Sequence, residues 1–425
     1  MIPFKRFNDP MTDFPIDRVR REFPALSRSH DGRSRVYMDN PAGTQLPRRV
    51  VDAVSNALVD AASNYGGSFE NSRNAEAIYA RAHDAMAEFV NARSSSEIVV
   101  AQSMTALTLH VSRSLGRRFA PGDEIVVTRM DHEGNVSPWL LLAQDLGLVV
   151  KWLAFNRDTW KIEPEDLQAL LGPRTRLLAL NYASNLTGSI NDVAGLVALA
   201  RSAGAMTYVD AVQLAPHQCI DVQALDCNFL VCSSYKFFGP HLGVLWGRRQ
   251  LLEELPAYKV RCAPAASPGK WETGTPQTEL LAGLAACVDY YDWLGGQVSG
   301  EDSRRGRIEA AYQAAIDHEA RLVTRLIDGI RAIPGTTVHG ITNPNRVGER
   351  VPTVSMTHEH VSPPQVAERL ARDGICVWSG HNYALEVVRH LGIDEATGVV
   401  RIGLAHYNTE EEVDRTLTAL EGALQ

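Results

Sequence analysis

TYVDAVQLAPHQCIDVQALDCNFLVCSSYKFFGPHLG, residues 207–243, contains two short apolar runs that each end in polar residues. The first run ends at Asp210, and the second, residues 229–232, leads into a polar segment that ends at Lys236. Short apolar runs bounded by polar residues, Gly and Pro are typical of buried parallel strands. Ligand sites in open α/β sheets lie just beyond the carboxyl ends of such strands. We therefore expect Asp210 and Lys236 to emerge side by side at one edge of one sheet.

A lysine and a carboxylate at that edge favour one cofactor. A lysine amine forms a Schiff base with an aldehyde, and pyridoxal phosphate (PLP) is the usual aldehyde. Asp210 against the pyridine nitrogen would keep the ring protonated, so that the ring accepts electrons from a substrate. Ser233 and Tyr235, which lie just before the lysine in the sequence, would supply hydroxyl groups for the phosphate. The alternative is a surface lysine and a loop aspartate with no shared ligand, and the spacing alone leaves both interpretations open.

Length, charge and hydropathy restrict the class of protein. The chain has 425 residues, of which 45% are hydrophobic, and is long enough for two domains. Its net charge of −8 disfavours a nucleic-acid-binding surface and is compatible with an enzyme that acts on small molecules. No apolar run reaches membrane-spanning length, and the N-terminus lacks a secretory hydrophobic region. We expect a cytoplasmic protein without membrane association.

The cysteines give no sign of a metal site or of a disulfide framework. The sequence has six, without CxxC or zinc-ligand spacing: Cys219, Cys227, Cys232, Cys262, Cys287 and Cys376. Three of them fall in apparent strand or core stretches, which predicts buried free thiols in a reducing compartment. We predict no metal ligands.

Apolar strands alternate with amphipathic helices through the first two thirds of the chain. This alternation is typical of an α/β fold with a doubly wound, mainly parallel sheet. Beyond residue 337 the alternation is lost, which predicts a smaller α+β domain at the C-terminus. The predicted parts are an N-terminal segment (1–35) that packs with the small domain, a large domain (36–290) and a small C-terminal domain (291–425).

Two further segments have features of a ligand site. The strand predicted at 97–101 is followed by a helix with Ser103 and Thr105 at its start, an arrangement in which helix amides bind phosphate. Ordinary helix capping by these residues is the alternative. No GxGxxG or Walker pattern is present, which disfavours nucleotide binding. In VYMDNPAGTQLP (36–47), Ala42 and Gly43 leave the backbone accessible, as in a loop that faces a substrate.

Six motifs occur along the chain in a characteristic order. They are YMDNPAGTQ, MDHEGNVSPW, YASNLTGSI, most of the stretch quoted first, WETGTPQT and RIGLAHYNTEEEV. With these motifs the chain resembles the class V aminotransferase family of fold-type I PLP enzymes, most closely its cysteine desulfurase branch. It is also similar to isopenicillin N epimerase, to C–S lyases and to PLP enzymes of lincosamide pathways. The resemblance implies a seven-stranded type of large-domain sheet.

The resemblance also implies roles for the residues that match the family's pattern. Lys236 would bind PLP covalently and Asp210 would contact the pyridinium nitrogen, while His132 would stack on the ring. Asn185 and Gln213 would hydrogen-bond the ring oxygen.

Other matching residues would bind the phosphate or the substrate. The implied phosphate ligands are Ser103, Met104, Thr105, Ser233, Tyr235 and, from a neighbouring subunit, Thr275. Met104 and Tyr235 depart from the family, which usually has Thr and His at these positions. The contact from Thr275 implies a homodimer with shared active sites. The implied substrate-binding residues are Ala42, Gly43, Arg73, Asn185, His381, Tyr383 and Arg401, with Arg401 gripping the α-carboxylate.

One departure from the cysteine desulfurase pattern bears on the reaction. In those enzymes a loop carries a Cys that accepts sulfur as a persulfide, and here VWSGHNYALEVV (377–388) places Tyr383 near that position. Trp378 replaces the arginine that precedes it. Cys376 is close in sequence, but it ends an apolar run and is interpreted as a core residue. Without a positioned thiolate, persulfide transfer lacks an acceptor.

We therefore expect a PLP-dependent lyase that breaks a C–S bond of a cysteine conjugate by β-elimination. Lys236 would act as the base at the substrate Cα. Tyr383 would be a catalytic hydrogen-bond donor to the leaving group, or would only line the pocket. The alternatives are decarboxylation coupled to oxidative deamination, epimerisation or aminotransfer in specialised, antibiotic biosynthesis. A PLP-binding scaffold without catalysis is disfavoured, since lysine, aspartate, histidine and arginine are retained together.

Overall fold

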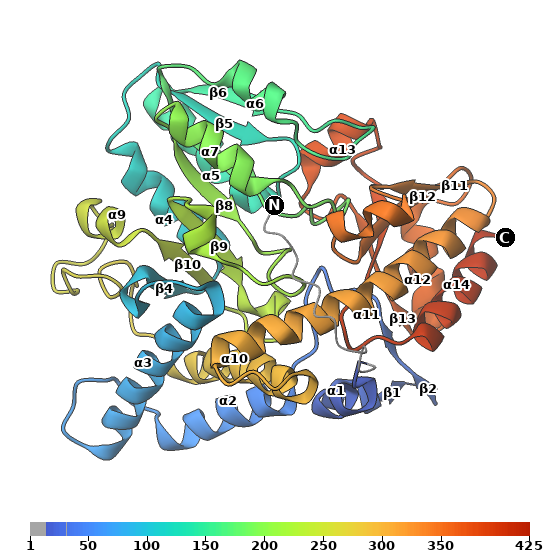
Figure 1. Ribbon diagram of the computed structural model, residues 1–425, viewed down its shortest axis with the longest axis horizontal. Helices are drawn as coiled ribbons and strands as arrows, with labels where there is room; N and C mark the ends of the chain where they lie inside the picture. The colour runs from blue at the N-terminus through green and yellow to red at the C-terminus, as the bar shows by residue number, and fades with distance from the viewer. Residues whose placement is uncertain (1–13, 31) are drawn as a thin grey trace.

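The computed structural model describes residues 14–30 and 32–425, and a seven-stranded sheet lies at its centre (Figure 1). In spatial order the strands are β4 (Ile98–Ala101), β10 (Gly243–Gly247), β9 (Phe229–Ser233), β8 (Met206–Asp210), β7 (Thr175–Asn181), β5 (Glu124–Thr128) and β6 (Val149–Leu153). Only β10 runs antiparallel to its neighbours in this sheet. The predicted α/β fold with a mainly parallel sheet is confirmed.

Successive residues of one strand contribute to two different hydrophobic cores. In β7, Leu177 and Ala179 join the core on one face of the sheet, and Leu178 and Leu180 join the core on the other. All four side chains are fully buried. Because strand side chains alternate between faces, an uninterrupted apolar run is the pattern of a sheet covered on both sides.

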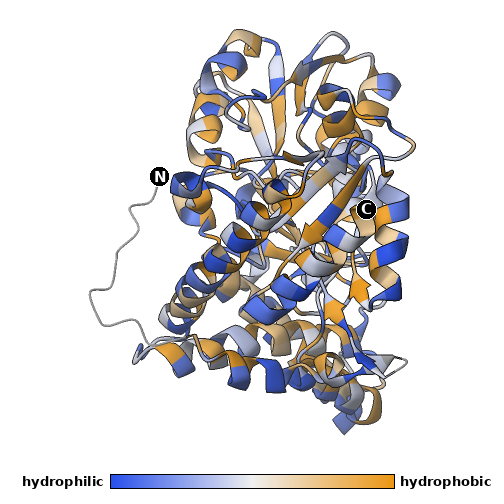
Figure 2. Cartoon of the chain, turned by 90° about the vertical axis from the view of Figure 1, so that its right-hand side faces the viewer, coloured by the Kyte–Doolittle hydropathy of each residue, from blue (hydrophilic) through white to orange (hydrophobic). Residues whose placement is uncertain are grey.

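Helices cover both faces of this sheet. In Figure 2 many of these helices carry both hydrophilic and hydrophobic residues. The helices packed on one face are α4 (Met104–Gly116), α5 (Ser137–Leu146) and α9 (Arg249–Glu254). The helices packed on the other face are α3 (Glu70–Val90), α6 (Pro164–Leu170), α7 (Val193–Ser202), α8 (Val222–Leu225) and α10 (Thr278–Val298). α2 (Arg48–Asp60) packs against α10.

A second, antiparallel sheet forms the C-terminal part of the fold. Its strands, in spatial order, are β11 (Thr336–His339), β12 (Thr353–His358), β15 (Val399–Gly403) and β14 (Trp378–Gly380). Its helices are α12 (Pro363–Arg372), α13 (Leu385–Leu391) and α14 (Glu410–Leu424). The long helix α11 (Arg304–Ala332) connects α10 with this part of the chain (Figure 1). A separate hydrophobic core lies here, with side chains from α11, α12, α14, β12 and β15.

The N-terminal segment is attached to the C-terminal part by strands and by polar contacts. β3 (Val36–Tyr37) pairs in parallel with β13 (Ile375–Cys376), and β1 (Ser29–His30) pairs with β2 (Arg33–Ser34). The helix of this segment is α1 (Ile16–Glu22).

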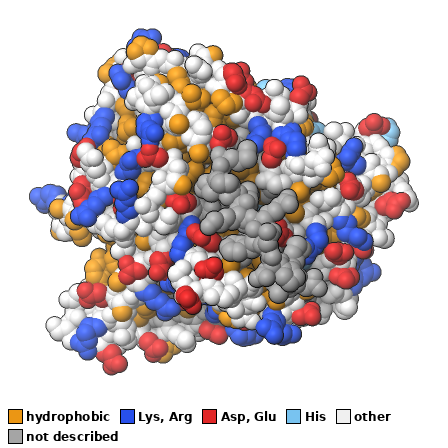
Figure 3. All heavy atoms as spheres, viewed as in Figure 1, with side chains coloured by type: hydrophobic (Ala, Val, Ile, Leu, Met, Phe, Trp, Pro, Cys, Tyr) orange, Lys and Arg blue, Asp and Glu red, His pale blue; other side chains and the backbone are white. Residues whose placement is uncertain are grey.

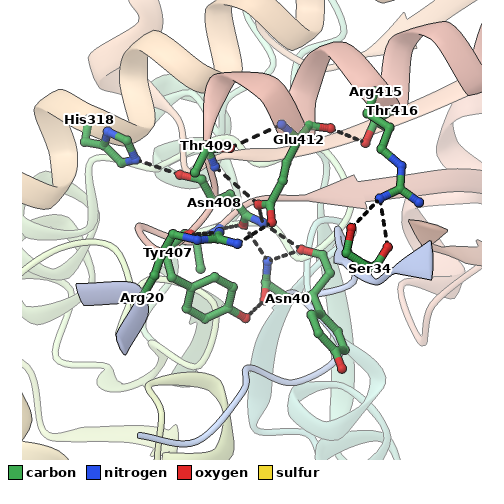
Figure 4. A network of polar contacts seen from close by, with 12 residues as sticks. Arg20, Ser34, Asn40, His318, Tyr407, Asn408, Thr409, Glu412, Arg415 and Thr416 are labelled. Atoms are coloured by element: carbon green, nitrogen blue, oxygen red, sulfur yellow. Dashed lines mark hydrogen bonds and ion pairs between the residues drawn. The ribbon is translucent and has the colours of Figure 1, made fainter. Parts of the chain in front are cut away.

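Figure 4 shows the polar contacts that join these segments. Arg20 in α1 forms an ion pair with Glu412 in α14 at 2.9 Å. Asn408 donates to Glu412 at 2.9 Å, and Asn40 donates to Asn408 at 3.2 Å. The turn that carries Asn40 is thus held against the C-terminal part of the fold.

The division of the chain into domains remains our proposal, with a large domain at 36–290 and a small domain at 291–425. Residue 290 lies within α10, so the proposed boundary divides this helix between the two domains. The N-terminal segment, 1–35, is proposed to pack with the small domain, and the part of it before residue 14 lies outside the described residues.

On the face drawn in Figure 3, acidic and basic side chains are intermixed rather than gathered by sign. None of the described helices is both long enough and apolar enough to span a membrane. Within residues 14–30 and 32–425, no three His, Cys, Asp or Glu side chains are grouped as metal ligands.

Candidate active site

A cavity of about 810 Å³ opens between the carboxyl edge of the large sheet and β14 and β15 of the second sheet. It brings together fourteen of the residues that the sequence singles out as a site. They are Ala42, Ser103, Met104, Thr105, His132, Asn185, Asp210, Gln213, Ser233, Tyr235, Lys236, His381, Tyr383 and Arg401.

Lys236 and Asp210 reach the cavity from neighbouring strands. Asp210 is the last residue of β8, where it lies opposite Val231 of the parallel strand β9, and Lys236 follows the end of β9. The Lys236 amine donates to the backbone carbonyl of Pro41 and lies 4.9 Å from the centre of the Tyr235 ring. The expected juxtaposition at one sheet edge is therefore observed.

The surroundings bring the pKa values of the Lys236 amine and the Asp210 carboxyl close together. Burial, with the positive charge of Arg401, lowers the pKa of Lys236 to about 7, although Asp210 and Asp39 oppose this shift. Burial raises the pKa of Asp210 to about 6, against a hydrogen bond from the Val212 backbone N–H and the charge of Lys236. A lysine that loses its proton near neutral pH is a competent nucleophile and base.

His132 lies over the cavity in a neutral state. Its Nδ1 accepts a hydrogen bond from the Gly134 backbone N–H at 2.9 Å, so the ring proton is on Nε2. Burial, with the positive charges of Lys236 and Arg401, lowers the pKa of His132 to about 3. An uncharged imidazole at this place is suited to ring stacking.

The N-terminus of α4 forms one wall of the cavity. Ser103 is the N-cap residue, and its hydroxyl accepts the Ala106 backbone N–H at 3.1 Å. Gly243 of β10 lies directly against the Ser103–Met104 backbone, where any Cβ would overlap it. Ser103 is thus both a helix cap and a cavity residue, and the first turn of the helix presents its amides as an anion site would.

Arg401 and Asn185 join the two sheets at the cavity. The Arg401 guanidinium is buried and donates to the Asn185 carbonyl oxygen at 3.0 Å. Burial lowers the pKa of Arg401 to about 10. The Asn185 amide nitrogen donates to the Asn382 carbonyl at 2.8 Å, while its Oδ1 is buried without a partner in the described part of the chain. The amide nitrogen of Gln213 donates to Thr353 at 3.0 Å.

Three predicted site residues do not line the cavity. Gly43 lies one layer behind, where a Cβ would be 3.5 Å from the Tyr235 ring. Arg73 is exposed on α3, which begins at Glu70 rather than after the predicted loop, and it donates to the Ser68 carbonyl. Thr275 is exposed on the loop before α10.

Several residues in or near the cavity could not be identified from the motifs in the sequence. Asn181, at the end of β7, lines it and could have been found by the same strand-end rule that identified Asp210. Glu395 also lines it, but from a loop whose sequence carries no local signal. Asp39 lies nearby with a buried Oδ1 that has no partner among the described residues. Burial raises the pKa of Asp39 to about 6, although the charges of Arg401 and Lys236 oppose this.

Residues at the base of the cavity could bind each functional part of PLP. Lys236 offers an amine for the aldehyde, Asp210 a carboxylate for the pyridine nitrogen, and the start of α4 at Ser103 a set of amides for the phosphate. The unpartnered Oδ1 of Asn185 leaves one buried hydrogen-bonding atom for a ligand. The residues present therefore fit the cofactor.

Comparisons with known proteins agree with this fit. The family profile of aminotransferase class-V matches residues 36–416. Cysteine desulfurase from Pectobacterium atrosepticum is 32% identical over 423 residues, which cover 96% of this chain and 98% of the relative. The aminotransferase-like protein FGM3 of Gibberella zeae is 33% identical over 422 residues, which cover 97% and 99%.

Two solved structures have the same fold over nearly their whole length. The cysteine desulfurase CsdA of Escherichia coli, in an S-sulfonic acid form, has a TM-score of 0.83 at 29% identity, covering 97% of this chain and 99% of CsdA. The apo cysteine desulfurase of Thermococcus onnurineus NA1 has a TM-score of 0.85 at 27% identity, covering 97% and 98%.

Fold and site together define a fold-type I enzyme that depends on PLP. The chain belongs to the class V aminotransferase family and is cysteine desulfurase-like. It is an enzyme that processes small amino-acid substrates.

Proposed function

We propose that the enzyme breaks a C–S bond of a cysteine conjugate by β-elimination, without a persulfide on the protein. The proposal rests on the position of Tyr383, which lines the cavity. The resemblance to cysteine desulfurases places the sulfur-accepting Cys near this position of the loop. Of the six cysteines, none lines the cavity.

Cys376 is poorly suited to replace the missing nucleophile. It belongs to β13, where it pairs with Tyr37, and its side chain is half-buried. Burial, with the negative charge of Asp39, raises the pKa of its thiol. A thiol held protonated at neutral pH attacks sulfur poorly.

Each residue at the base of the cavity has a task in the proposed elimination. PLP supplies an electron-withdrawing ring that stabilises negative charge at the substrate Cα. Lys236 takes the Cα proton, and its lowered pKa keeps a large neutral fraction available at neutral pH. Asp210 keeps the pyridine nitrogen protonated, His132 stacks on the ring, and Arg401 holds the α-carboxylate.

The reaction then completes by loss of sulfur from Cβ. The Cβ–S bond breaks, and the sulfur leaves with both electrons and gains a proton from the Tyr383 hydroxyl or from water. The enamine that remains takes up one water molecule and yields pyruvate and ammonia. No sulfur atom is transferred to the protein.

The decisive experiment measures products from the PLP-loaded enzyme. With S-methylcysteine we expect pyruvate, ammonia and methanethiol in equal amounts, and no pyruvate from the Lys236→Ala variant. With free cysteine we expect no protein-bound persulfide by mass spectrometry. Alanine together with a persulfide, or transfer of the amino group to a keto acid, would overturn the proposal. Racemised substrate or carbon dioxide release would identify one of the alternative reactions.

We further propose a homodimer with shared active sites. Thr275 is exposed and outside its own subunit's cavity, and the apolar side chains of Val260, on the same connection between α9 and α10, and of Phe69, before α3, are also exposed. Exposed apolar groups of this kind are frequent at subunit contacts. Sedimentation that gives a single-chain mass would contradict a dimer. A cytoplasmic location is proposed because all six cysteines are free thiols.

A further inference from the structure

The mouth of the cavity differs in chemistry from its base. The base is polar and charged, whereas two of the large apolar or aromatic side chains that the protein exposes stand at the mouth. Trp378 is 52% exposed and Tyr383 is 65% exposed, and both line the cavity. Large aromatic rings left in water at the opening of a pocket are typical of a binding surface for a ligand.

Trp378 is placed by the register of the second sheet. It lies directly opposite Arg401 in the antiparallel pair of β14 and β15. Residues directly opposite in such a pair project to the same face, with Cβ atoms about 4.5–5.5 Å apart. A substrate whose α-carboxylate is held by Arg401 therefore has the Trp378 indole within reach of its side chain.

Tyr383 is held at the mouth by contacts to the segment that follows β5 of the large sheet. Its carbonyl accepts the Glu133 backbone N–H at 2.8 Å, and its ring stacks on His132 with centroids 5.4 Å apart. Asn382 and Tyr383 both have left-handed backbone conformations, with φ of 51° and 58°. Non-glycine residues rarely adopt this conformation unless the surrounding structure requires it. Such residues are frequent at ligand sites. The phenol ring is thus fixed beside the opening.

We infer that the substrate carries an aromatic group on its side chain, which binds between Trp378 and Tyr383 at the mouth while Arg401 holds the α-carboxylate. This inference names the class of substrate for the proposed function. It rests on the proposed function only for the part of the substrate that reacts, and not for the aromatic group. An amino acid of this class extends from the polar base to the aromatic mouth. Smaller amino acids occupy the base alone and leave both rings in water.

Binding can be tested without relying on the elimination. Homophenylalanine and α-aminobutyrate share the α-amino and α-carboxylate groups, and neither has a leaving group at Cβ. By calorimetry with the PLP-loaded enzyme, we expect homophenylalanine to bind roughly tenfold to a hundredfold more tightly, as burial of a phenyl ring implies. In Trp378→Ala this preference falls by about threefold to tenfold, the range for loss of one aromatic pair. Trp378→Phe keeps most of it.

A matched control uses Leu141 on α5, which is also 52% exposed but does not line the cavity. Leu141→Ala keeps the full preference for homophenylalanine. Equal affinities of the wild-type enzyme for the two amino acids would overturn the inference, as would a preference that survives in Trp378→Ala combined with Tyr383→Leu. A preference for homophenylalanine without pyruvate from S-benzylcysteine supports the aromatic site while refuting the proposed elimination.

Discussion

The phenol ring of Tyr383 stacks on the imidazole of His132, with ring centroids 5.4 Å apart and planes inclined by 22°. His132 lies in the segment after β5 of the large sheet, and Tyr383 belongs to the loop after β14 of the second sheet. The stack therefore connects the two halves of the active site across the cavity.

The pH at which apoenzyme reacts with PLP tests the environment of Lys236. Because burial and Arg401 lower the pKa of this amine to about 7, its neutral form is half populated near pH 7 instead of at the usual value of about 10.4. We expect the rate of covalent PLP uptake to rise with pH and to level off above about pH 8. The visible absorbance of the bound cofactor measures this rate. A rate that keeps rising to pH 10, or covalent attachment of PLP to Lys236→Ala, would contradict the assignment.

Substitution of Asp210 tests the contact to the pyridine nitrogen. An amide in Asp210→Asn has nearly the same shape but no negative charge to hold the ring proton. We expect exchange of the substrate Cα hydrogen to slow by about a hundredfold or more, the range for loss of a group that stabilises developing charge. Deuterium incorporation followed by NMR measures the exchange. In the wild type, exchange should decline below about pH 7 as the Lys236 amine gains a proton, and should fall further below about pH 6 as the Asp210 carboxylate gains one. An unchanged exchange rate in the variant refutes the role.

Arg401 should determine affinity for the α-carboxylate. Arg401→Ala removes one partner of a buried charge pair, which typically costs about 2–5 kcal/mol of binding free energy. We expect the KM for an amino acid to rise strongly, while binding of the matching carboxamide changes little. Equal losses for the acid and the amide would show that Arg401 does not contact this group.

Asp39 should influence Lys236 through charge alone. Its carboxylate favours the protonated amine of Lys236, so Asp39→Asn removes a factor that raises the pKa of the lysine. We expect the midpoint of PLP uptake to shift to lower pH, provided that it is measured above about pH 6, where Asp39 is ionised. Glu395→Gln, a change at the mouth of the same cavity, is the control and should leave the midpoint in place. A shift to higher pH would show that the dominant effect of Asp39 is structural.

Tyr383 should not carry sulfur. A phenol has no sulfur atom with which to form a persulfide. If its hydroxyl donates a proton to the leaving group, Tyr383→Phe should reduce turnover by about tenfold to a thousandfold. If the ring only lines the pocket, the substitution has little effect on kcat. Mass spectrometry that detects a sulfur adduct on Cys376 after treatment with cysteine would return the enzyme to the desulfurase group.

The sequence by itself determined the sheet and the base of the site. Apolar runs such as residues 229–232 are typical of strands buried on both faces of a mainly parallel sheet, and polar residues at the ends of parallel strands emerge at its carboxyl edge. Asp210 and Lys236 were therefore predictable, since their positions follow from local pattern and strand direction, whereas His132 was identified only through the family resemblance.

Only the tertiary structure decided what surrounds that base. The register of β14 against β15 places Trp378 opposite Arg401. Packing of distant loops brings Glu395 to the cavity and Asp39 close enough to Lys236 and Arg401 to interact with their charges. Arg73 lies outside the cavity, although the resemblance placed it in the site. Thr275 also lies outside the cavity of its own chain, and the resemblance placed it in the site of a neighbouring subunit. The physical reason is that local hydrophobic periodicity specifies an element and its buried face, whereas register and loop packing depend on contacts between segments far apart in the chain.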